Sequence, residues 1–363
     1  FFVCKFVLFC YNLLEVIMKI LHTADIHLGA KNVKLSLDKQ NQLKIEQNLL
    51  ISKLFEDAYN QDYDIVLICG DLFHSKTVSS KVAINFFKAV EDFSRPVLYI
   101  KGNHDEKFVF SQMPKNFIVL DENNPNFQLN NTIFWGQVSP KFIAEHMDTN
   151  KSNILLLHGD IKNRNDRDYV DLNSYLSLSF NYIALGHIHS EEITKFGDIP
   201  VAYPGSLFSN GFDEVGAKGY IEVLLDENGI IEKFVEFCTY SYKIVECDIT
   251  GLIYYKDILK KTSDSLKDCK QKDLVRLILT GYYSEECEKY PSSLLNELSS
   301  DYFYLEILDK SKLQIDFEKI KNEELSFKAE FLLLVEKGDE DEDTKNKICQ
   351  IGIEALRGDD LSI

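Results

Sequence analysis

Two pairs of potential metal ligands stand at a spacing that directs both side chains of a pair to the same side. One residue separates Asp25 from His27, and one separates His187 from His189. Residues i and i+2 of an extended segment point the same way, so each pair could reach one metal ion. Such pairs also occur by chance in loops, and the function therefore depends on what else converges on them.

A single carboxylate, Asp71, follows a short apolar run. Residues 65–69 show no polar alternation, which predicts a parallel strand that is buried on both faces and ends at Gly70. Asp71 then lies just past the carboxyl end of a strand, where open α/β sheets place their ligands. Its two oxygens could bridge two cations.

Two further apolar runs end on polar donors. The run 97–100 leads into Asn103, His104 and Asp105, which offer an amide oxygen and an imidazole beside a carboxylate that could orient it. A turn with a salt-bridged histidine is the alternative for this stretch. The run 153–157 ends at His158.

Seven oxygen or nitrogen donors thus stand at predicted strand ends: Asp25, His27, Asp71, Asn103, His158, His187 and His189. If one carboxylate is shared, seven side chains give each of two cations four protein ligands. The mixed carboxylate, imidazole and amide set favours Mn²⁺, Fe²⁺ or Zn²⁺ over Mg²⁺ or Ca²⁺. Two such cations stabilise the attacking and leaving oxygens of a phosphoryl displacement.

The elements that would position these donors alternate between strand and helix. Strands at 19–24, 65–69 and 97–100 are separated by helical apolar stripes at 40–60 and from Ser79 onward. This order predicts a parallel sheet with right-handed crossovers. From about residue 243 the pattern changes to a smaller α+β region.

Composition limits the class of protein. The 363 residues carry a formal net charge of −18, which argues against a protein that binds nucleic acid over its whole surface. Bound divalent cations would reverse that sign locally. The eight cysteines form no CxxC pair, so they predict neither a zinc site nor a disulfide framework, and a cytoplasmic location is expected.

The motifs, in their order along the chain, resemble the motif series of the calcineurin-like metallophosphoesterases. The matching stretches are Asp25-x-His27, Gly70-Asp-x-x-His74, Gly102-Asn-His-Asp105, His158 and Gly186-His-x-His189. The resemblance spans about residues 18–206 and implies an α/β fold, in which a sandwich of two sheets is flanked by helices. A smaller α+β cap domain would follow it.

Within that superfamily the chain is most similar to the DNA double-strand-break repair exonucleases, the SbcD-type nuclease subunits. The similarity rests on Gly-Asp-Leu-Phe-His ending at His74, on Tyr-Pro-Gly-Ser at 203–206 and on the cap-like region. Protein phosphatases of the superfamily instead show Asp-Arg-Gly starting three residues after the bridging aspartate. A Mn²⁺-dependent DNA exonuclease or endonuclease is therefore expected. The alternatives are a phosphodiesterase for nucleotides or other small phosphoesters, and a non-catalytic subunit that binds DNA or an ATPase.

The resemblance also assigns roles to residues. It implies one metal held by Asp25, His27, Asp71 and His189, and a second held by Asp71, Asn103, His158 and His187. It makes His104 the proton donor to the leaving 3′ oxygen, with Asp105 orienting it and His74 supporting the site or contacting phosphate.

The same resemblance implies two protein partners besides DNA, whereas no membrane partner is expected. One is a second copy of the chain, and the other is an SMC-like ABC ATPase of the SbcC type, which could supply cationic surface for DNA. One departure concerns how the ATPase would dock, because beyond the cap the sequence predicts a single short helix at 344–356 where family members use a helical pair.

These patterns divide the chain into four segments. Residues 1–17 are expected to be an upstream extension, with a membrane anchor as the alternative, and 18–240 are expected to be the nuclease domain. Residues 241–336 would form the cap. Residues 337–363 would be an acidic linker, with five carboxylates at 339–343, followed by the short helix.

Overall fold

The computed structural model describes residues 18–30, 35–74, 79–106, 112–284, 287, 291–322 and 326–357. The predicted extension at 1–17 lies outside the described residues. The chain divides into two compact units, Phe1–Lys243 and Ile244–Ile363.

The first unit contains a six-stranded sheet that carries the first three motifs. Its order is β12-β11-β1-β2-β3-β4, in which β1 to β4 run parallel and β11 is antiparallel to both β1 and β12. The strands are β1 (Met18–Thr23), β2 (Ile65–Cys69), β3 (Val97–Ile100), β4 (Phe117–Val119), β11 (Gly219–Asp226) and β12 (Gly229–Glu236).

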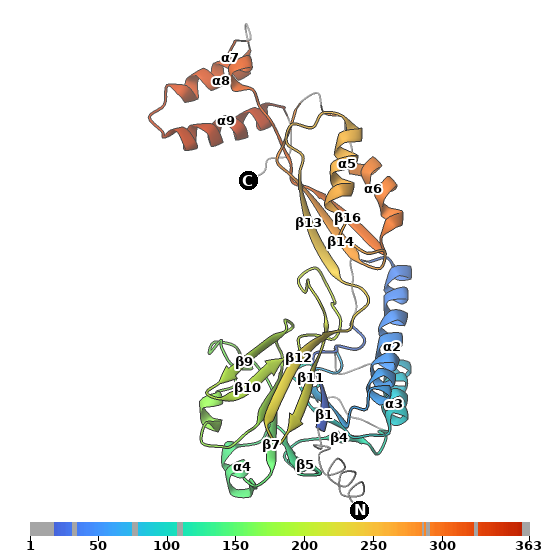
Figure 1. Cartoon of the computed structure of the whole chain (residues 1–363). Helices are drawn as coiled ribbons and strands as arrows, with labels where there is room; N and C mark the ends of the chain where they lie inside the picture. The colour runs from blue at the N-terminus through green and yellow to red at the C-terminus, as the bar shows by residue number, and fades with distance from the viewer. Residues whose placement is uncertain are drawn as a thin grey trace, which may run out of the picture. The chain divides into compact units, whose positions relative to one another are not determined.

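Two helices provide the crossovers of this sheet and pack against one another (Figure 1). Helix α2 (Leu37–Asn60) begins where Ser36 accepts the Lys39 N–H, and helix α3 (Ser80–Phe93) begins where Ser79 accepts the Val82 N–H. Such caps satisfy backbone N–H groups that lack partners within the helix. They fix where each crossover returns to the sheet.

A second six-stranded sheet of the same unit carries the later motifs. Its order is β5-β6-β7-β8-β10-β9, with parallel pairing from β6 through β7 and β8 to β10. The strands are β5 (Asn126–Leu129), β6 (Thr132–Trp135), β7 (Ser152–His158), β8 (Tyr182–Gly186), β9 (Glu192–Phe196) and β10 (Ile199–Tyr203). Helix α4 (Pro140–His146) and a 3₁₀ turn (Leu172–Tyr175) accompany this sheet.

The two sheets bury their facing sides in one apolar core. Ile20 and Leu98 of the first sheet belong to the same buried cluster as Phe134 and Leu156 of the second. Both strands of the β7–β8 pair are buried on nearly every residue, which explains why their sequences show no polar alternation. The predicted α/β sandwich flanked by helices is confirmed.

The second unit is a smaller α+β assembly. A three-stranded sheet, β13-β14-β16, packs with helices α5 and α6 around buried residues that include Leu277 and Leu294. Its elements are β13 (Tyr242–Asp248), α5 (Tyr255–Ser265), β14 (Leu274–Thr280), β15 (Tyr282–Tyr283), α6 (Pro291–Leu298), a 3₁₀ turn (Ser299–Asp301), β16 (Tyr304–Asp309) and β17 (Lys312–Leu313).

The predicted C-terminal helix is present at Glu342–Arg357, but the expectation that it is single is wrong. Helices α8 (Phe327–Glu336) and α9 (Glu342–Arg357) pack together around Leu332 and Ile353, next to the short helix α7 (Phe317–Lys321). A short apolar run such as 331–335 does not distinguish a strand from a buried helix, which is why α8 was expected within the α+β domain.

The acidic run is also more than a solvated linker. Asp341 accepts the Thr344 N–H, and Glu342 and Asp343 lie in the first turn of α9. Carboxylates at a helix N-terminus are favourable because they face the positive end of the helix dipole. The run therefore turns the chain and starts α9.

Candidate metal centre

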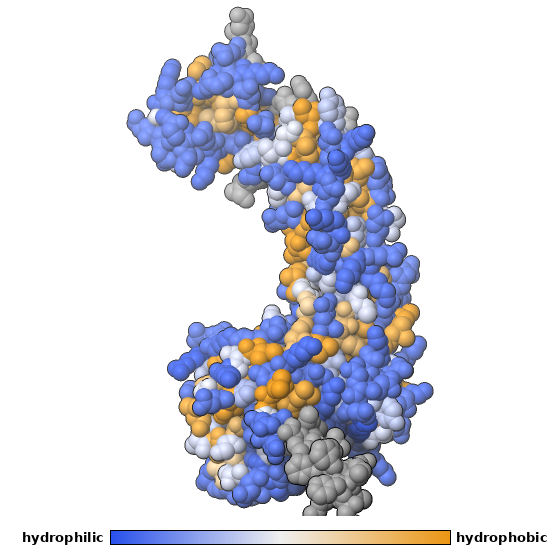
Figure 2. Space-filling view, in the orientation of Figure 1, coloured by the Kyte–Doolittle hydropathy of each residue, from blue (hydrophilic) through white to orange (hydrophobic). Residues whose placement is uncertain are grey.

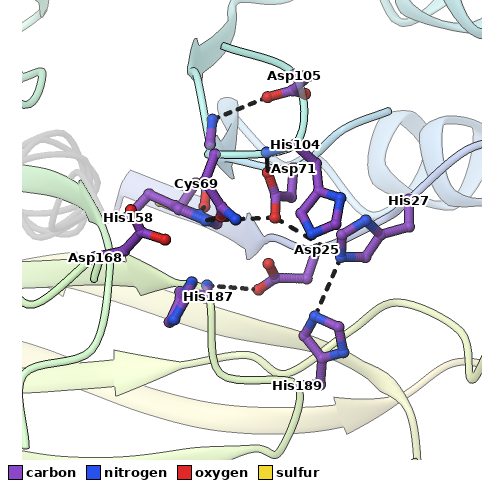
Figure 3. A network of polar contacts seen from close by, with 12 residues as sticks. Asp25, His27, Cys69, Asp71, His104, Asp105, His158, Asp168, His187 and His189 are labelled. Carbon is purple, nitrogen blue, oxygen red and sulfur yellow. Dashed lines mark hydrogen bonds and ion pairs between the residues drawn. The ribbon is translucent and has the colours of Figure 1, made fainter. Parts of the chain in front are cut away.

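The predicted donors meet at the carboxyl ends of strands from both sheets (Figure 3). The loops after β1, β2 and β3 supply Asp25, His27, Asp71 and Asn103. The ends of β7 and β8 supply the remaining donors, which are His158, His187 and His189. The sandwich brings the two groups together, which a single sheet could not do.

Four of the predicted donor residues adopt backbone conformations that are unfavourable for residues with a side chain. Asp25, His27 and Asp71 have φ angles of 49°, 48° and 49°, and His187 has a φ of 102°. Non-glycine residues rarely have positive φ angles, and where they do the surrounding structure must hold them. The loops after β1, β2 and β8 are therefore constrained to present these side chains.

Asp25, His27 and His189 form the first group of converging donors. Their ligand atoms all lie within 4.8 Å of one another, and His27 Nε2 lies 3.1 Å from His189 Nε2. Among the described residues, the buried Asp25 Oδ1 and His27 Nδ1 have no hydrogen-bond partner. Buried polar atoms without partners are costly, and a cation in this group would satisfy the carboxylate oxygen.

Asp25, Asp71 and His158 form a second converging group. The His158 Nδ1–H donates to the Cys69 carbonyl over 2.9 Å, which leaves Nε2 as the ligand atom. That nitrogen lies 3.1 Å from Asn103 Oδ1. Asn103 therefore joins this second group.

Asp71 lies between the two groups. Its Oδ2 is 3.8 Å from His27 Nε2 and 3.5 Å from His158 Nε2. The Asp71 Oδ1 accepts the His104 N–H over 2.9 Å, which fixes the carboxylate. This position fits a ligand shared by two cations.

His187 is oriented differently from the other histidines. Its ring lies 5.3 Å from the His158 ring, but its Nε2 is 3.6 Å from Asp166 Oδ1. Its backbone N–H donates to Asp25 Oδ2 over 2.8 Å. The structure therefore places His187 beside the second group, with Asp166 as a neighbour that the sequence did not indicate, and its role as a ligand stays a prediction.

Burial and close carboxylate–imidazole contacts together shift the pKa values of the site residues. Burial raises the pKa of Asp25 to about 6 and lowers the pKa of His27 to about 3. Burial disfavours the charged forms of Asp71 and His158, but the contact between the two side chains favours these forms more strongly. The pKa of Asp71 is therefore lowered, and that of His158 is raised. A cation would favour the carboxylate form of Asp25 and the neutral form of His158, so its binding should release protons.

The donor set fits two divalent cations. Carboxylate, imidazole and amide donors suit Mn²⁺, Fe²⁺ and Zn²⁺. The two groups share Asp25, and Asp71 of the second group also lies close to His27 of the first. When bound, such a pair polarises a phosphoryl group and favours a deprotonated nucleophile. The protein contributes the fixed loops and the tautomers of His158 and His189.

The expectation that Asp105 orients the His104 ring is not met. Asp105 is fully buried, and its carboxylate accepts the Gly102 N–H over 2.9 Å and the Phe73 N–H over 3.1 Å. The His104 Nδ1–H donates to the His74 carbonyl over 3.2 Å instead. Asp105 therefore joins the loops that carry Asp71 and Asn103, and the chain around His74 holds the His104 ring.

Glycine is required at two points of the site. A Cβ atom at Gly102 would lie 2.1 Å from Asp71 Oδ1, and one at Gly70 would lie 2.1 Å from His158 Nδ1. Gly70 also has a φ of 86°. These glycines let the two strand ends approach closely enough for their donors to converge.

His74 and His104 form the exposed side of the centre. Their rings stack with centroids 5.5 Å apart, and the His104 ring lies 4.9 Å from the His27 ring. Both side chains are exposed, whereas His27 is buried. They are thus accessible to a substrate that approaches the buried donors.

Comparison with known proteins agrees with this geometry. The model of the family described as calcineurin-like phosphoesterase matches residues 18–211, more than half of the 363 residues. The chain belongs to this family. Family membership indicates metal-dependent phosphoester hydrolysis, and the matched region holds all seven predicted donors.

Several solved structures resemble part of this family member. The protein TT1561 of Thermus thermophilus is 14% identical, covers 60% of this chain and 99% of its own, and gives a TM-score of 0.40. A dimetal phosphatase from Danio rerio is 9% identical, with coverage of 60% and 95% and a TM-score of 0.43. An archaeal phosphodiesterase is 15% identical, with coverage of 60% and 100% and a TM-score of 0.34. At these scores the likeness carries no argument about activity.

Within the described ranges, no helix combines the length and the apolar character needed to cross a membrane.

Proposed function

We propose that this phosphoesterase is a Mn²⁺-dependent DNA nuclease of the SbcD-type branch that acts in double-strand-break repair. The observation that carries the proposal is the pair of exposed imidazoles, His74 and His104, stacked beside the buried donors. His74 ends the Gly-Asp-Leu-Phe-His stretch that distinguishes this branch from the protein phosphatases.

In this proposal His104 donates a proton to the leaving 3′ oxygen. Its Nδ1–H is engaged by the His74 carbonyl, so Nε2 is the atom available for proton transfer. His74 supports this ring through its backbone and offers its own imidazole to a phosphate oxygen.

The C-terminal helical pair is the surface we propose for the ATPase partner. The described part of α8 and α9 exposes Phe327 at 84% and Leu334 at 71%, next to a groove of about 680 Å³ lined by Phe331, Gly352 and Leu356. Figure 2 shows apolar side chains on this helical region, surrounded by hydrophilic ones. An amphipathic coiled-coil segment suits such a groove. The partner would also supply the cationic surface that a chain of net charge −18 lacks.

A second copy of the chain is proposed to pack on helices α2 and α3. Ile45 and Leu49 of α2 are 60% and 59% exposed, and Ile84 of α3 is 63% exposed. Ile45 and Leu49 line a groove of about 670 Å³ between the two helices. Apolar side chains gathered on one face favour burial against an equivalent surface.

One observation favours a smaller substrate as the alternative. A polar pocket of about 520 Å³ lies beside Asn103 and His158, and Gln137 and Arg167 also line it. This volume falls in the range of small-ligand sites. A nucleotide phosphodiesterase is therefore the second candidate.

A direct comparison of substrates tests the proposal. The full chain would be given labelled duplex DNA, a cyclic nucleotide and a phosphopeptide under one Mn²⁺ condition. We expect DNA to be hydrolysed with the highest kcat/KM. Efficient turnover of the cyclic nucleotide with inert DNA would replace the nuclease with the second candidate.

A further inference from the structure

His189 has a supporting structure that begins in the matched family region and extends beyond it. Its Nδ1–H donates to Glu214 Oε1 over 2.7 Å, while its Nε2 faces His27 Nε2. Glu214 is three residues past the end of the family match at 211. Nothing in the spacing of the ligand motifs indicated this carboxylate.

The segment that carries Glu214 is itself held in place. Glu214 Oε2 accepts the Asn210 N–H over 3.0 Å, and its backbone carbonyl accepts the Ser209 hydroxyl over 2.7 Å. The side chain of Glu214 is only 12% exposed, so it has little freedom to turn away.

Lys218 supports the same ligand from its backbone side. Its Nζ donates to the His189 carbonyl over 2.7 Å, and the residue is 4% exposed. A buried lysine is costly unless it is paired. Burial lowers the pKa of Lys218, and the neighbouring Glu214 carboxylate counteracts this by favouring the charged form. Ring and backbone of His189 are thus both fixed from the segment 209–218.

We infer that Glu214 is a positioning residue, which sets the tautomer of His189 and directs Nε2 into the first donor group. A carboxylate that accepts the second N–H of a metal-binding histidine fixes the ring and strengthens it as a ligand. The inference deepens the metal site on which the proposed function rests. It concerns the site of Asp25, His27 and His189, because the ring that Glu214 holds, that of His189, belongs to this group and not to the group of Asp25, Asp71 and His158.

Metal titration of the full chain, without DNA, tests this inference. Mn²⁺ binding to metal-free protein would be followed by calorimetry and by electron paramagnetic resonance, which distinguishes a coupled pair from a single ion. Glu214→Ala should weaken one of the two sites by roughly 10- to 100-fold and leave the other unchanged. Glu214→Gln should weaken the same site less, because an amide oxygen still accepts the N–H.

Glu222→Gln is the matched control. Glu222 is also a partly buried carboxylate of this unit, with the Tyr63 hydroxyl at 2.7 Å and Lys19 Nζ at 3.0 Å, but it lies outside the converging donor groups. This variant should keep both Mn²⁺ affinities. If the control weakens one site as Glu214→Ala does, the inference is overturned.

The remaining outcomes are also decisive. Two unchanged sites in Glu214→Ala, or two sites weakened equally, would overturn the positioning role. If Glu214→Ala does not fold, Glu214→Gln is used instead. The inference then requires that Glu214→Gln weakens Mn²⁺ binding at one site and leaves the other unchanged. Wild-type protein that binds no Mn²⁺ would overturn both the proposed function and this inference. Two Mn²⁺ sites of equal affinity in the wild type and in Glu214→Ala would overturn this inference alone.

Discussion

At the residue scale, Asp105 joins the loops that bring Asp71 and Asn103 together. Its carboxylate accepts two buried backbone N–H groups, those of Gly102 and Phe73. We expect Asp105→Ala to lower the free energy of unfolding of the metal-free chain by about 1–3 kcal/mol for each N–H left without a partner. Urea denaturation measures this loss. Unchanged stability with reduced turnover would mean that Asp105 acts through His104 after all.

His104 is expected to act in chemistry and not in metal binding. It is exposed, and its neighbour Asn103 already faces His158. His104→Ala should keep both metals and lower turnover of DNA by roughly 10²- to 10⁴-fold, the usual contribution of a positioned general acid.

The leaving group provides the control for this prediction. A nitrophenyl phosphodiester departs with little need of a proton, so the loss in His104→Ala should be smaller on that substrate. Equal losses on both substrates, or loss of metal, would make His104 a ligand or a structural residue.

At the residue scale, the donors could be predicted because they lie at the end of a strand or a few residues after it in the sequence. The contacts that fix them could not, because they join distant residues. Asp105 meets Phe73 across 32 positions, and Glu214 meets His189 across 25. The ring orientation of His187 likewise depends on Asp166 in another loop.

At the element scale, a buried histidine connects the two sheets. His22 of β1 donates from Nε2 to the Leu185 carbonyl over 3.1 Å, so Nδ1 accepts the Tyr182 hydroxyl over 2.9 Å. Both partners lie in β8 of the other sheet. Burial lowers the pKa of His22 to about 3, which keeps the ring neutral in the folded protein.

This pKa predicts acid sensitivity of the sandwich. Below about pH 6.5 the unfolded chain binds a proton at His22, whereas the folded chain binds it only at about pH 3. The free energy of unfolding therefore decreases as the pH falls through this window. Between pH 7 and pH 5 the loss is about 2 kcal/mol. Urea unfolding of metal-free protein should show this extra loss in the wild type and not in His22→Gln. Equal losses in both would show that His22 is charged in the folded state.

Helices with a clear apolar period could be predicted, whereas α8, whose apolar residues do not show this period, was not identified as a helix. Helix α3 begins after Ser79 as its sequence indicated. Helix α8 was missed because its apolar residues run consecutively at 331–335, and only packing against α9 shows that they are helical.

At the scale of the whole molecule, the exposed apolar side chains of α2 and α3 predict self-association. Leu49→Glu should shift the sedimentation of the full chain from dimer to monomer, because a charge buried in the interface is costly. Leu176→Glu, at an exposed apolar position outside α2 and α3, is the control and should remain dimeric. A wild-type chain that is monomeric at micromolar concentration would contradict the prediction.

One carboxylate, Asp71, lies close to a histidine of each donor group, and this feature favours two bound cations in this family member. Asp71 Oδ2 lies within 3.8 Å of His27 and 3.5 Å of His158, one histidine from each group. The most direct measurement is the metal content of wild-type and Asp71→Asn protein after dialysis against Mn²⁺, with phosphodiester hydrolysis measured on the same samples. We predict two Mn²⁺ ions per wild-type chain, and loss of both tightly held ions and of hydrolysis in Asp71→Asn. Two tightly held ions in the variant would contradict the shared position of Asp71.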